Sequence, residues 1–210
     1  MSETIDIKGT IISNDDKWVY DFCGIEATCP ANVLSKLSGT EDIDVYINSG
    51  GGDVIAASEI YEALRQYKGK VLIHVVGLAA SAASVIMCAR ECEISPTSLV
   101  MIHNVAAGTY GDKNAMEHTA GVLSAADEAV CVAYQIKTGK SKDELLGMMN
   151  EETWLPAQKA VELGFCDRVS GVNTLTNGYC RMVTDEQRAR CEARKRALLD
   201  FIEKEKATIE

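Results

Sequence analysis

Two apolar segments that each run directly into a helical segment constrain the fold of this chain more than any other feature. Residues 44–48 have the pattern of a buried strand, pass through glycines 50–52 and lead into a helical pattern over residues 54–67. Residues 71–76 form a second apolar strand, and a helix of very small residues is predicted at 79–90. Strands that alternate with helices across short turns are typical of β-α-β units around a parallel sheet. The sequence therefore predicts an α/β fold.

The rest of the chain extends this pattern on both sides. A strand at residues 5–12 begins the domain, and residues 18–20 are expected to pair with it as a second strand. One long helix over residues 113–137 is predicted between Asp112 as its N-cap and Gly139 as its terminator. The other expected elements are a helix at 30–37, strands at 92–95 and 99–102, helices at 141–149 and 157–163, and a strand at 166–169.

Length and charge exclude several classes of function. The 210 residues suit one domain, 1–170, followed by a polar linker, 171–184, and a charged helical tail, 185–210. The formal net charge of −10 argues against a nucleic-acid partner, because phosphate binding needs a cationic surface. The first residues lack the basic and apolar regions of a secretory signal, and polar side chains interrupt the longest apolar stretch. We therefore expect a cytoplasmic protein without a membrane partner.

The eight cysteines do not follow a metal-binding pattern. They form no CxxC pair and no spacing with histidine that is typical of a zinc site. We interpret them as reduced thiols that mostly fill the core. No metal ion and no cofactor is predicted.

Three short clusters contain the residue types that catalysis requires. Residues 48–53 include three consecutive glycines, which allow positive φ angles and expose backbone N–H groups to a ligand. Ser81 stands where a helix begins, so the helix dipole acts on its hydroxyl and the Ala82 amide is free to donate. His103 follows an apolar strand directly. Taken singly, each cluster also has a structural interpretation, respectively as a plain turn, an N-cap serine and a structural histidine.

In their order and spacing, the strings YINSGGGD, GLAAS and MIHN resemble the motifs of the ClpP peptidase family. The similarity covers residues 5–169. It implies a ClpP/crotonase-like α/β fold of repeated β-α-β units, with a protruding handle helix at residues 113–137. It also implies a ring-forming homo-oligomer, in which two stacked rings enclose a proteolytic chamber and polypeptides are the substrates.

The resemblance assigns a catalytic role to a set of side chains. Ser81 matches the family's nucleophile and His103 matches its general base. Glu152 falls on the third member of the triad, with Glu151 as the fallback. The implied reaction is hydrolysis of peptide bonds by acyl transfer through an enzyme-bound ester.

The resemblance also assigns a role to the glycine loop and to the start of the following helix. The amides of Gly52 and Ala82 match the oxyanion donors of the family. Gly50 and Gly51 then belong to the substrate-binding part of the same loop.

Departures from the family pattern point to a narrower branch. Gly50 replaces the usual proline, and Asn104 and Val105 stand where a proline normally follows the histidine. These features, and residues 152–155, look similar to the head-maturation proteases of tailed phages and prophages, whose substrates are capsid or scaffold proteins. The alternatives are a housekeeping-type Clp subunit fed by an AAA+ ATPase, a catalytically inactive ring scaffold, and an acyl-CoA hydratase-like enzyme on the same fold.

Overall fold

The computed structural model describes residues 3–171 together with Ala193 and Arg196. The strands are β1 (Glu3–Ile11), β2 (Ala27–Thr28), β3 (Ile43–Gly52), β4 (Val71–Ala80), β5 (Glu91–Ile94), β6 (Leu99–Ile102), β7 (Thr153–Pro156) and β8 (Arg168–Val169). The helices are α1 (Lys17–Cys23), α2 (Pro30–Leu34), α3 (Val54–Gln66), α4 (Ala82–Met87), α5 (Lys113–Thr138), α6 (Lys142–Asn150) and α7 (Ala157–Glu162).

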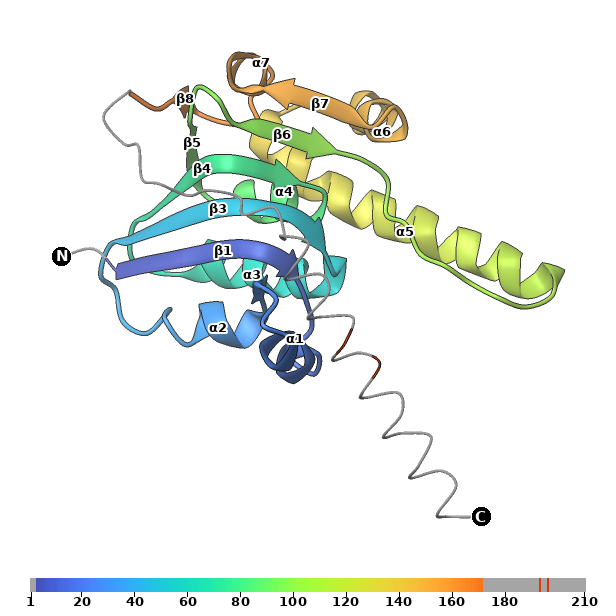
Figure 1. The fold of residues 1–210 in the computed structure, drawn as a ribbon. Helices are drawn as coiled ribbons and strands as arrows, with labels where there is room; N and C mark the ends of the chain where they lie inside the picture. The colour runs from blue at the N-terminus through green and yellow to red at the C-terminus, as the bar shows by residue number, and fades with distance from the viewer. Residues whose placement is uncertain (1–2, 172–192, 194–195, 197–210) are drawn as a thin grey trace.

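Within residues 3–171, all eight strands belong to one sheet (Figure 1). The strand order is β2-β1-β3-β4-β5-β8, and β6 lies off this path, paired with both β4 and β7. Every pair is parallel except β6 with β7. The predicted α/β class is therefore confirmed. Since the carboxyl ends of parallel strands meet at one edge of a sheet, that edge is where side chains from different β-α units come together.

Strand β4 pairs with β3 on one side and changes its neighbour along the other. Residues 72–75 pair with β5, whereas residues 78–80 pair with β6. Gly77 lies between the two pairings, where a β-carbon would come within 2.4 Å of the Asn48 side-chain oxygen. The change of partner brings the end of β4 beside the end of β6, which is the arrangement on which the site below depends.

Helices α3 and α4 pack together against one face of the sheet (Figure 1). All six residues of α4 are buried, which explains why this helix is built from small and apolar side chains. The long helix α5 behaves differently. Its buried residues are confined to its last third (Val130, Cys131, Ala133 and Tyr134), and its first turns extend past the sheet in Figure 1.

The predicted helix ends agree with the observed caps. The Asp112 carboxylate accepts a hydrogen bond from the Ala115 N–H, and Gly139 ends α5 with a left-handed φ of 71°. The Ser141 hydroxyl accepts from the Glu144 N–H at the start of α6. In each case the side chain or the glycine satisfies backbone groups that a helix end leaves without an intrahelical partner.

Two predicted elements were wrong. Residues 18–20 do not form a strand beside β1 but lie in helix α1, which Gly24 ends with a φ of 65°. The helix expected at 79–90 begins only at Ala82, because Ala79 and Ala80 continue β4 and pair with β6. The first error arose because the three apolar or aromatic residues 18–20 are too short a pattern to distinguish a strand from one side of a helix.

The expected linker at 171–184 and tail at 185–210 lie outside the described residues, apart from Gly171, Ala193 and Arg196. Among the helices of the described part, none combines the length and the hydrophobicity that crossing a bilayer requires.

Candidate active site

Ser81 and His103 come together at the carboxyl ends of two neighbouring parallel strands. Ala80, the last residue of β4, pairs with Met101 of β6, and the Ser81 N–H donates to the Met101 carbonyl at 2.9 Å. His103 follows the end of β6, and its Nε2 lies 2.8 Å from the Ser81 hydroxyl oxygen. Both side chains are only partly buried. This distance is what a serine nucleophile and its general base require.

The backbone of Ser81 has a conformation that non-glycine residues rarely adopt. Its φ is 53° and its ψ is −126°, at the sharp turn between β4 and α4. Such a conformation costs about 1–3 kcal/mol and is found most often at functional sites. Ser81 occupies the N-cap position of α4, yet its side chain makes no capping hydrogen bond. The interpretation of Ser81 as an ordinary N-cap serine is therefore wrong, because the hydroxyl is turned toward His103.

The glycine loop that ends β3 packs directly against Ser81. A β-carbon on Gly51 would lie 2.7 Å from the Ser81 Cβ and 3.0 Å from the Ala82 nitrogen. On Gly52 it would lie 2.1 Å from the Ile11 carbonyl oxygen. Both residues also have positive φ angles, 95° and 146°. Gly50, in contrast, has open space around it. The close approach thus requires glycine at positions 51 and 52 only.

Two polar side chains that sequence reasoning missed hold this loop in place. The buried Ser49 hydroxyl donates to the Gly9 carbonyl at 2.6 Å and accepts from the Gly51 N–H at 3.1 Å. The Asn48 side-chain oxygen accepts from the Leu78 N–H at 3.1 Å. The Gly51 amide is therefore engaged inside the protein. Both residues lie in the string YINSGGGD, so the motif itself was the available signal.

The start of α4 supplies the second backbone group that the sequence singled out. Ala82 is the first residue of this helix, and the first N–H groups of a helix have no intrahelical acceptor. The contact between the Gly51 position and the Ala82 nitrogen places the glycine loop next to this amide. The arrangement is chemically able to offer N–H donors to an oxyanion beside Ser81.

The predicted third member of the triad is not in contact with His103. Strands β6 and β7 pair Ile102 with Thr153, so Glu152 is the next residue toward His103 along the ladder. Its carboxylate instead accepts a hydrogen bond from the Trp154 indole N–H at 3.1 Å. Among residues 3–171, the hydrogen bonds of the His103 side chain involve Ser81 alone. Glu152 has a φ of 50°, an unusual backbone for a glutamate.

The fallback residue, Glu151, does not contact His103 in this structure either. Glu151 is exposed and is the C-cap of α6, where its N–H donates to the Gly147 carbonyl. Both Glu152 and Glu151 remain predictions for the third position.

The segment after His103 is attached to the helices beside it. The Val105 N–H donates to the Asp127 carboxylate of α5 at 2.6 Å. The Asn104 amide nitrogen donates to the Asn150 side-chain oxygen of α6 at 2.6 Å. Asp127 was not predicted from the sequence, since a single aspartate in a long polar helix gives no signal of a partner 22 residues away.

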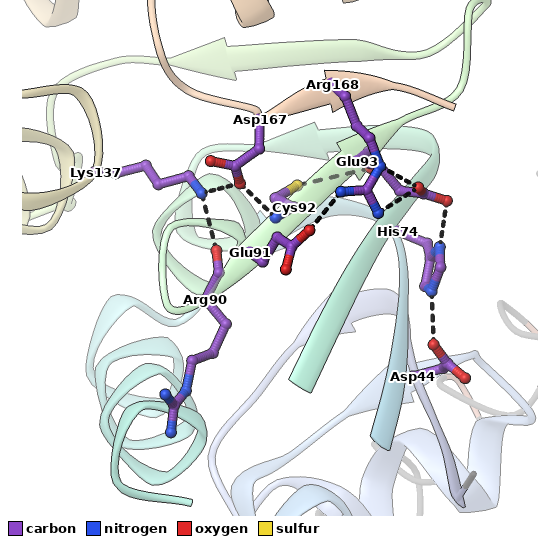
Figure 2. A network of polar contacts seen from close by, with 9 residues as sticks. All are labelled: Asp44, His74, Arg90, Glu91, Cys92, Glu93, Lys137, Asp167 and Arg168. Carbon is purple, nitrogen blue, oxygen red and sulfur yellow. Dashed lines mark hydrogen bonds and ion pairs between the residues drawn. The ribbon is translucent and has the colours of Figure 1, made fainter. Parts of the chain in front are cut away.

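A second histidine lies between carboxylates but does not form a catalytic site (Figure 2). On β4, the His74 Nδ1 lies 2.8 Å from Glu93 of β5, and its Nε2 lies 2.9 Å from Asp44 of β3. The ring also stacks on Tyr46 with centroids 4.6 Å apart. Because both ring nitrogens already face carboxylate oxygens, neither is available to activate a nucleophile. His74 is therefore a structural residue that links three neighbouring strands.

The same network joins the edge of the sheet to α5 (Figure 2). Arg168 of β8 pairs with Glu91 and Glu93 of β5. Asp167 accepts from the Cys92 N–H and pairs with Lys137 of α5. These contacts hold the short strand β8 in place.

The buried cysteines in the described part of the chain are poor candidates for an alternative nucleophile. Cys29, Cys88, Cys92, Cys131 and Cys166 are buried. Burial raises the pKa of Cys88, and the contact with the Cys166 sulfur at 3.8 Å together with burial raises the pKa of Cys92. A thiol whose pKa is raised stays protonated and is a poor nucleophile. In the described residues, no group of three or more histidine, cysteine, aspartate or glutamate side chains is arranged to hold a metal ion.

Comparison with known proteins gives one consistent result. A family model described as Clp protease matches residues 30–173. The ATP-dependent Clp protease proteolytic subunit of Bacteroides fragilis is 32% identical over 139 residues, which are 65% of this chain and 67% of the relative. Subunit 1 of Salinibacter ruber is 29% identical over 147 residues, 68% of this chain and 62% of the relative. Subunit 2 of Tropheryma whipplei is 25% identical over 158 residues, 74% of this chain and 85% of the relative.

A solved structure supports the fold independently. A mutant ClpP1 from Listeria monocytogenes superimposes with a TM-score of 0.66 at 22% sequence identity. The match covers 81% of this chain and 92% of that one. At this identity the likeness concerns the fold alone, and it agrees with the mostly parallel sheet described above.

Proposed function

The chain belongs to the Clp protease family, and from this premise we propose that it is a serine endopeptidase with Ser81 as nucleophile and His103 as general base. The single observation that carries the proposal is the 2.8 Å approach of the His103 Nε2 to a Ser81 hydroxyl that has no capping role. The strained turn that presents this hydroxyl gives further support.

The proposed reaction proceeds in two steps. The Ser81 oxygen forms a bond to the carbonyl carbon of the scissile peptide while its proton passes to the His103 Nε2. The imidazolium then gives this proton to the leaving amine as the C–N bond breaks, and an acyl ester remains on Ser81. Water, deprotonated by His103, hydrolyses the ester and restores the hydroxyl.

Backbone amides are proposed to stabilise the tetrahedral intermediates. Gly52 and Ala82 are the donors, and each such donor contributes on the order of 3 kcal/mol to lowering the barrier. Gly50 is proposed to lie along the bound substrate, since it is the exposed residue of the loop with open space around it. Glu152 is proposed to orient His103 after its side chain leaves Trp154.

We also propose that the active form is a homo-oligomer of stacked rings in the cytoplasm, acting on polypeptides. Exposed apolar side chains on α5 support a contact with further copies of the chain (Met116, Val122, Val132 and Ile136). Native mass spectrometry tests this directly, and a strictly monomeric, active protein would contradict it.

The narrower role has two candidates, each supported by a different observation. The curated relatives reported above are described as ATP-dependent Clp protease subunits, which favours work with an AAA+ ATPase. Gly50 and Asn104 depart from the family pattern in the manner of phage head-maturation proteases, which favours capsid or scaffold substrates. Cleavage of an unstructured polypeptide without any ATPase favours the second role, and cleavage only with an added AAA+ partner favours the first.

The peptidase proposal is tested by intact-mass analysis after treatment with a fluorophosphonate, which modifies activated serines. We expect one adduct per chain in the wild type and none in Ser81→Ala or His103→Ala. Ser98→Ala is the matched control, because Ser98 is a buried serine that bonds to the Val75 carbonyl outside the site. A wild-type protein that forms no adduct would favour an inactive ring scaffold or an acyl-CoA hydratase-like enzyme instead.

A further inference from the structure

A buried pair of hydroxyl groups connects helix α5 to the backbone of Ser81. The Ser84 hydroxyl, on α4, lies 2.6 Å from the Ser81 carbonyl oxygen and 2.7 Å from the Tyr134 hydroxyl. Ser84 is fully buried and Tyr134 is 1% exposed. The residues are 50 positions apart, so the contact depends on the packing of α5 against α4.

The direction of both hydrogen bonds follows from the acceptor at one end. A carbonyl oxygen only accepts, so Ser84 donates its single hydroxyl proton to Ser81. Tyr134 must then donate its own proton to the Ser84 oxygen. Burial raises the pKa of Tyr134 above its ordinary value, which keeps the phenol protonated and able to donate. The Tyr134 ring makes an edge-to-face contact with the Phe165 ring, with their centroids 5.7 Å apart, and this contact holds the Tyr134 ring in its orientation.

The simplest explanation is that two buried hydroxyls satisfy each other. Serine hydroxyls commonly bond back to a carbonyl three or four residues earlier, but here that carbonyl belongs to Ser81, whose φ is 53°. The same carbonyl already accepts from the Ser84 N–H at 2.9 Å. Two donors from one residue therefore hold the peptide group that follows the nucleophile, the group whose N–H belongs to Ala82. A buried apolar pair would fill the space without the desolvation that two hydroxyls require.

We propose that Ser84 and Tyr134 are positioning residues for Ser81: a relay from Tyr134 through Ser84 fixes the strained turn that presents the nucleophile and the Ala82 amide. This inference rests on the proposed function. Neither residue touches substrate in this role. Both act through the Ser81 carbonyl, with Ser84 as the direct contact and Tyr134 as the residue that orients it.

The test compares Ser84→Ala, Tyr134→Phe and the double variant in the full-length chain. The readouts are kcat and KM for a fluorogenic peptide and the rate constant of fluorophosphonate labelling. We expect Ser84→Ala to lower kcat and the labelling rate constant about tenfold with KM unchanged, since one buried hydrogen bond to the turn is lost. Tyr134→Phe should lower both about threefold, because Ser84 keeps its bond to Ser81. In a serial relay, the double variant should be no slower than Ser84→Ala alone.

Matched controls separate positioning from general destabilisation. Ser98→Ala removes a buried serine that donates to the Val75 carbonyl, and Tyr67→Phe removes a phenol that donates to the Glu41 carbonyl. Both should lower the melting temperature by as much as the test variants and leave the labelling rate constant unchanged. Amide hydrogen exchange over residues 79–85 should become faster in Ser84→Ala and not in Ser98→Ala.

Failure of the relay can be distinguished from failure of the proposed function. Normal labelling of Ser84→Ala and Tyr134→Phe, with a labelled wild type, would overturn the relay and leave the proposed function intact. Additive losses in the double variant would also overturn a serial relay. A wild type that is never labelled would overturn the proposed function and with it the catalytic consequence of the relay. Unchanged hydrogen exchange in Ser84→Ala would overturn the claim that Ser84 fixes the turn at Ser81.

Discussion

Replacing Gly51 by alanine should damage the site much more than the same replacement one residue earlier. A β-carbon at position 51 meets the Ser81 Cβ at 2.7 Å, the Ala80 carbonyl oxygen at 2.8 Å and the Ala82 nitrogen at 3.0 Å. Two of these atoms belong to the backbone, so no flexible side chain can turn away. Gly50 has nothing within 4 Å of the same position and no positive φ, which makes Gly50→Ala the matched control.

The size of the effect follows from two contributions. Alanine at a φ of 95° costs about 1–2 kcal/mol, because a side chain in the left-handed region crowds the backbone. Overpacking against neighbouring atoms costs about 1–3 kcal/mol more. With ~3 kcal/mol as a central value, the melting temperature should fall by roughly 6–12 °C for a protein of this size. Gly50→Ala should change it by less than about 2 °C.

The effect on reactivity should be larger than the effect on stability suggests. Restoring an ordinary contact of 3.4 Å requires the Ser81 Cβ to move by about 0.7 Å. A misplacement of about 1 Å can cost about a hundredfold in rate, so Gly51→Ala should lower the fluorophosphonate labelling rate constant about 10- to 100-fold.

Thermal unfolding and labelling are measured on both variants at a temperature where each is folded. If Gly50→Ala and Gly51→Ala lose stability to the same degree, the close packing of the loop on Ser81 is refuted. If Gly51→Ala is less stable but labels at the wild-type rate, the loop is structural and does not position the nucleophile.

Three further predictions concern other parts of the molecule. Glu152→Gln should lower kcat at least tenfold if Glu152 orients His103, whereas Glu151→Gln should not; the reverse result would transfer the role to Glu151. His74→Phe keeps an aromatic ring to stack on Tyr46 but removes the hydrogen bonds to Glu93 and Asp44, so urea unfolding should show a loss of about 1–3 kcal/mol with the labelling rate constant unchanged. Burial raises the pKa of Tyr134 above its ordinary 10.0, so its contribution to stability is complete below pH 10 and decreases as the unfolded chain ionises above it. The stability difference between the wild type and Tyr134→Phe should therefore shrink above pH 10, and a constant difference would show that the phenol does not ionise differently on folding.

The sequence predicted the elements whose boundaries carry local chemical signals. Asp112 and Gly139 bound α5, and Ser141 begins α6, because caps and left-handed glycines act within a few residues. Ser81 and His103 were found from their motifs, and the structure brings them within hydrogen-bond distance. The fold class followed from the alternation of apolar strands and helices.

Features that depend on pairing between distant segments could not be predicted in this way. Strand β7 has only four residues and exists through its antiparallel pairing with β6. The extension of β4 through Gly77 to Ala80 depends on β6 as a new neighbour. The contact of Ser84 with Tyr134 joins residues 50 positions apart, and the sequence around each residue does not predict it. A sequence motif also does not predict that the Glu152 carboxylate accepts a hydrogen bond from the Trp154 indole N–H.

The change of neighbour along β4 has a consequence for how this protein can vary. The first half of β4 shares its hydrogen bonds with β5 and, through β5, with β8, while the second half shares them with β6. Sequence changes at the β5–β8 edge therefore reach the ends of β4 and β6 along the sheet only across the change of partner at Gly77, and otherwise through α5, where Lys137 pairs with Asp167. Along the sheet, the strand that presents Ser81 is thus supported by β6 at the site, while β5 and β8 can vary beside its other half.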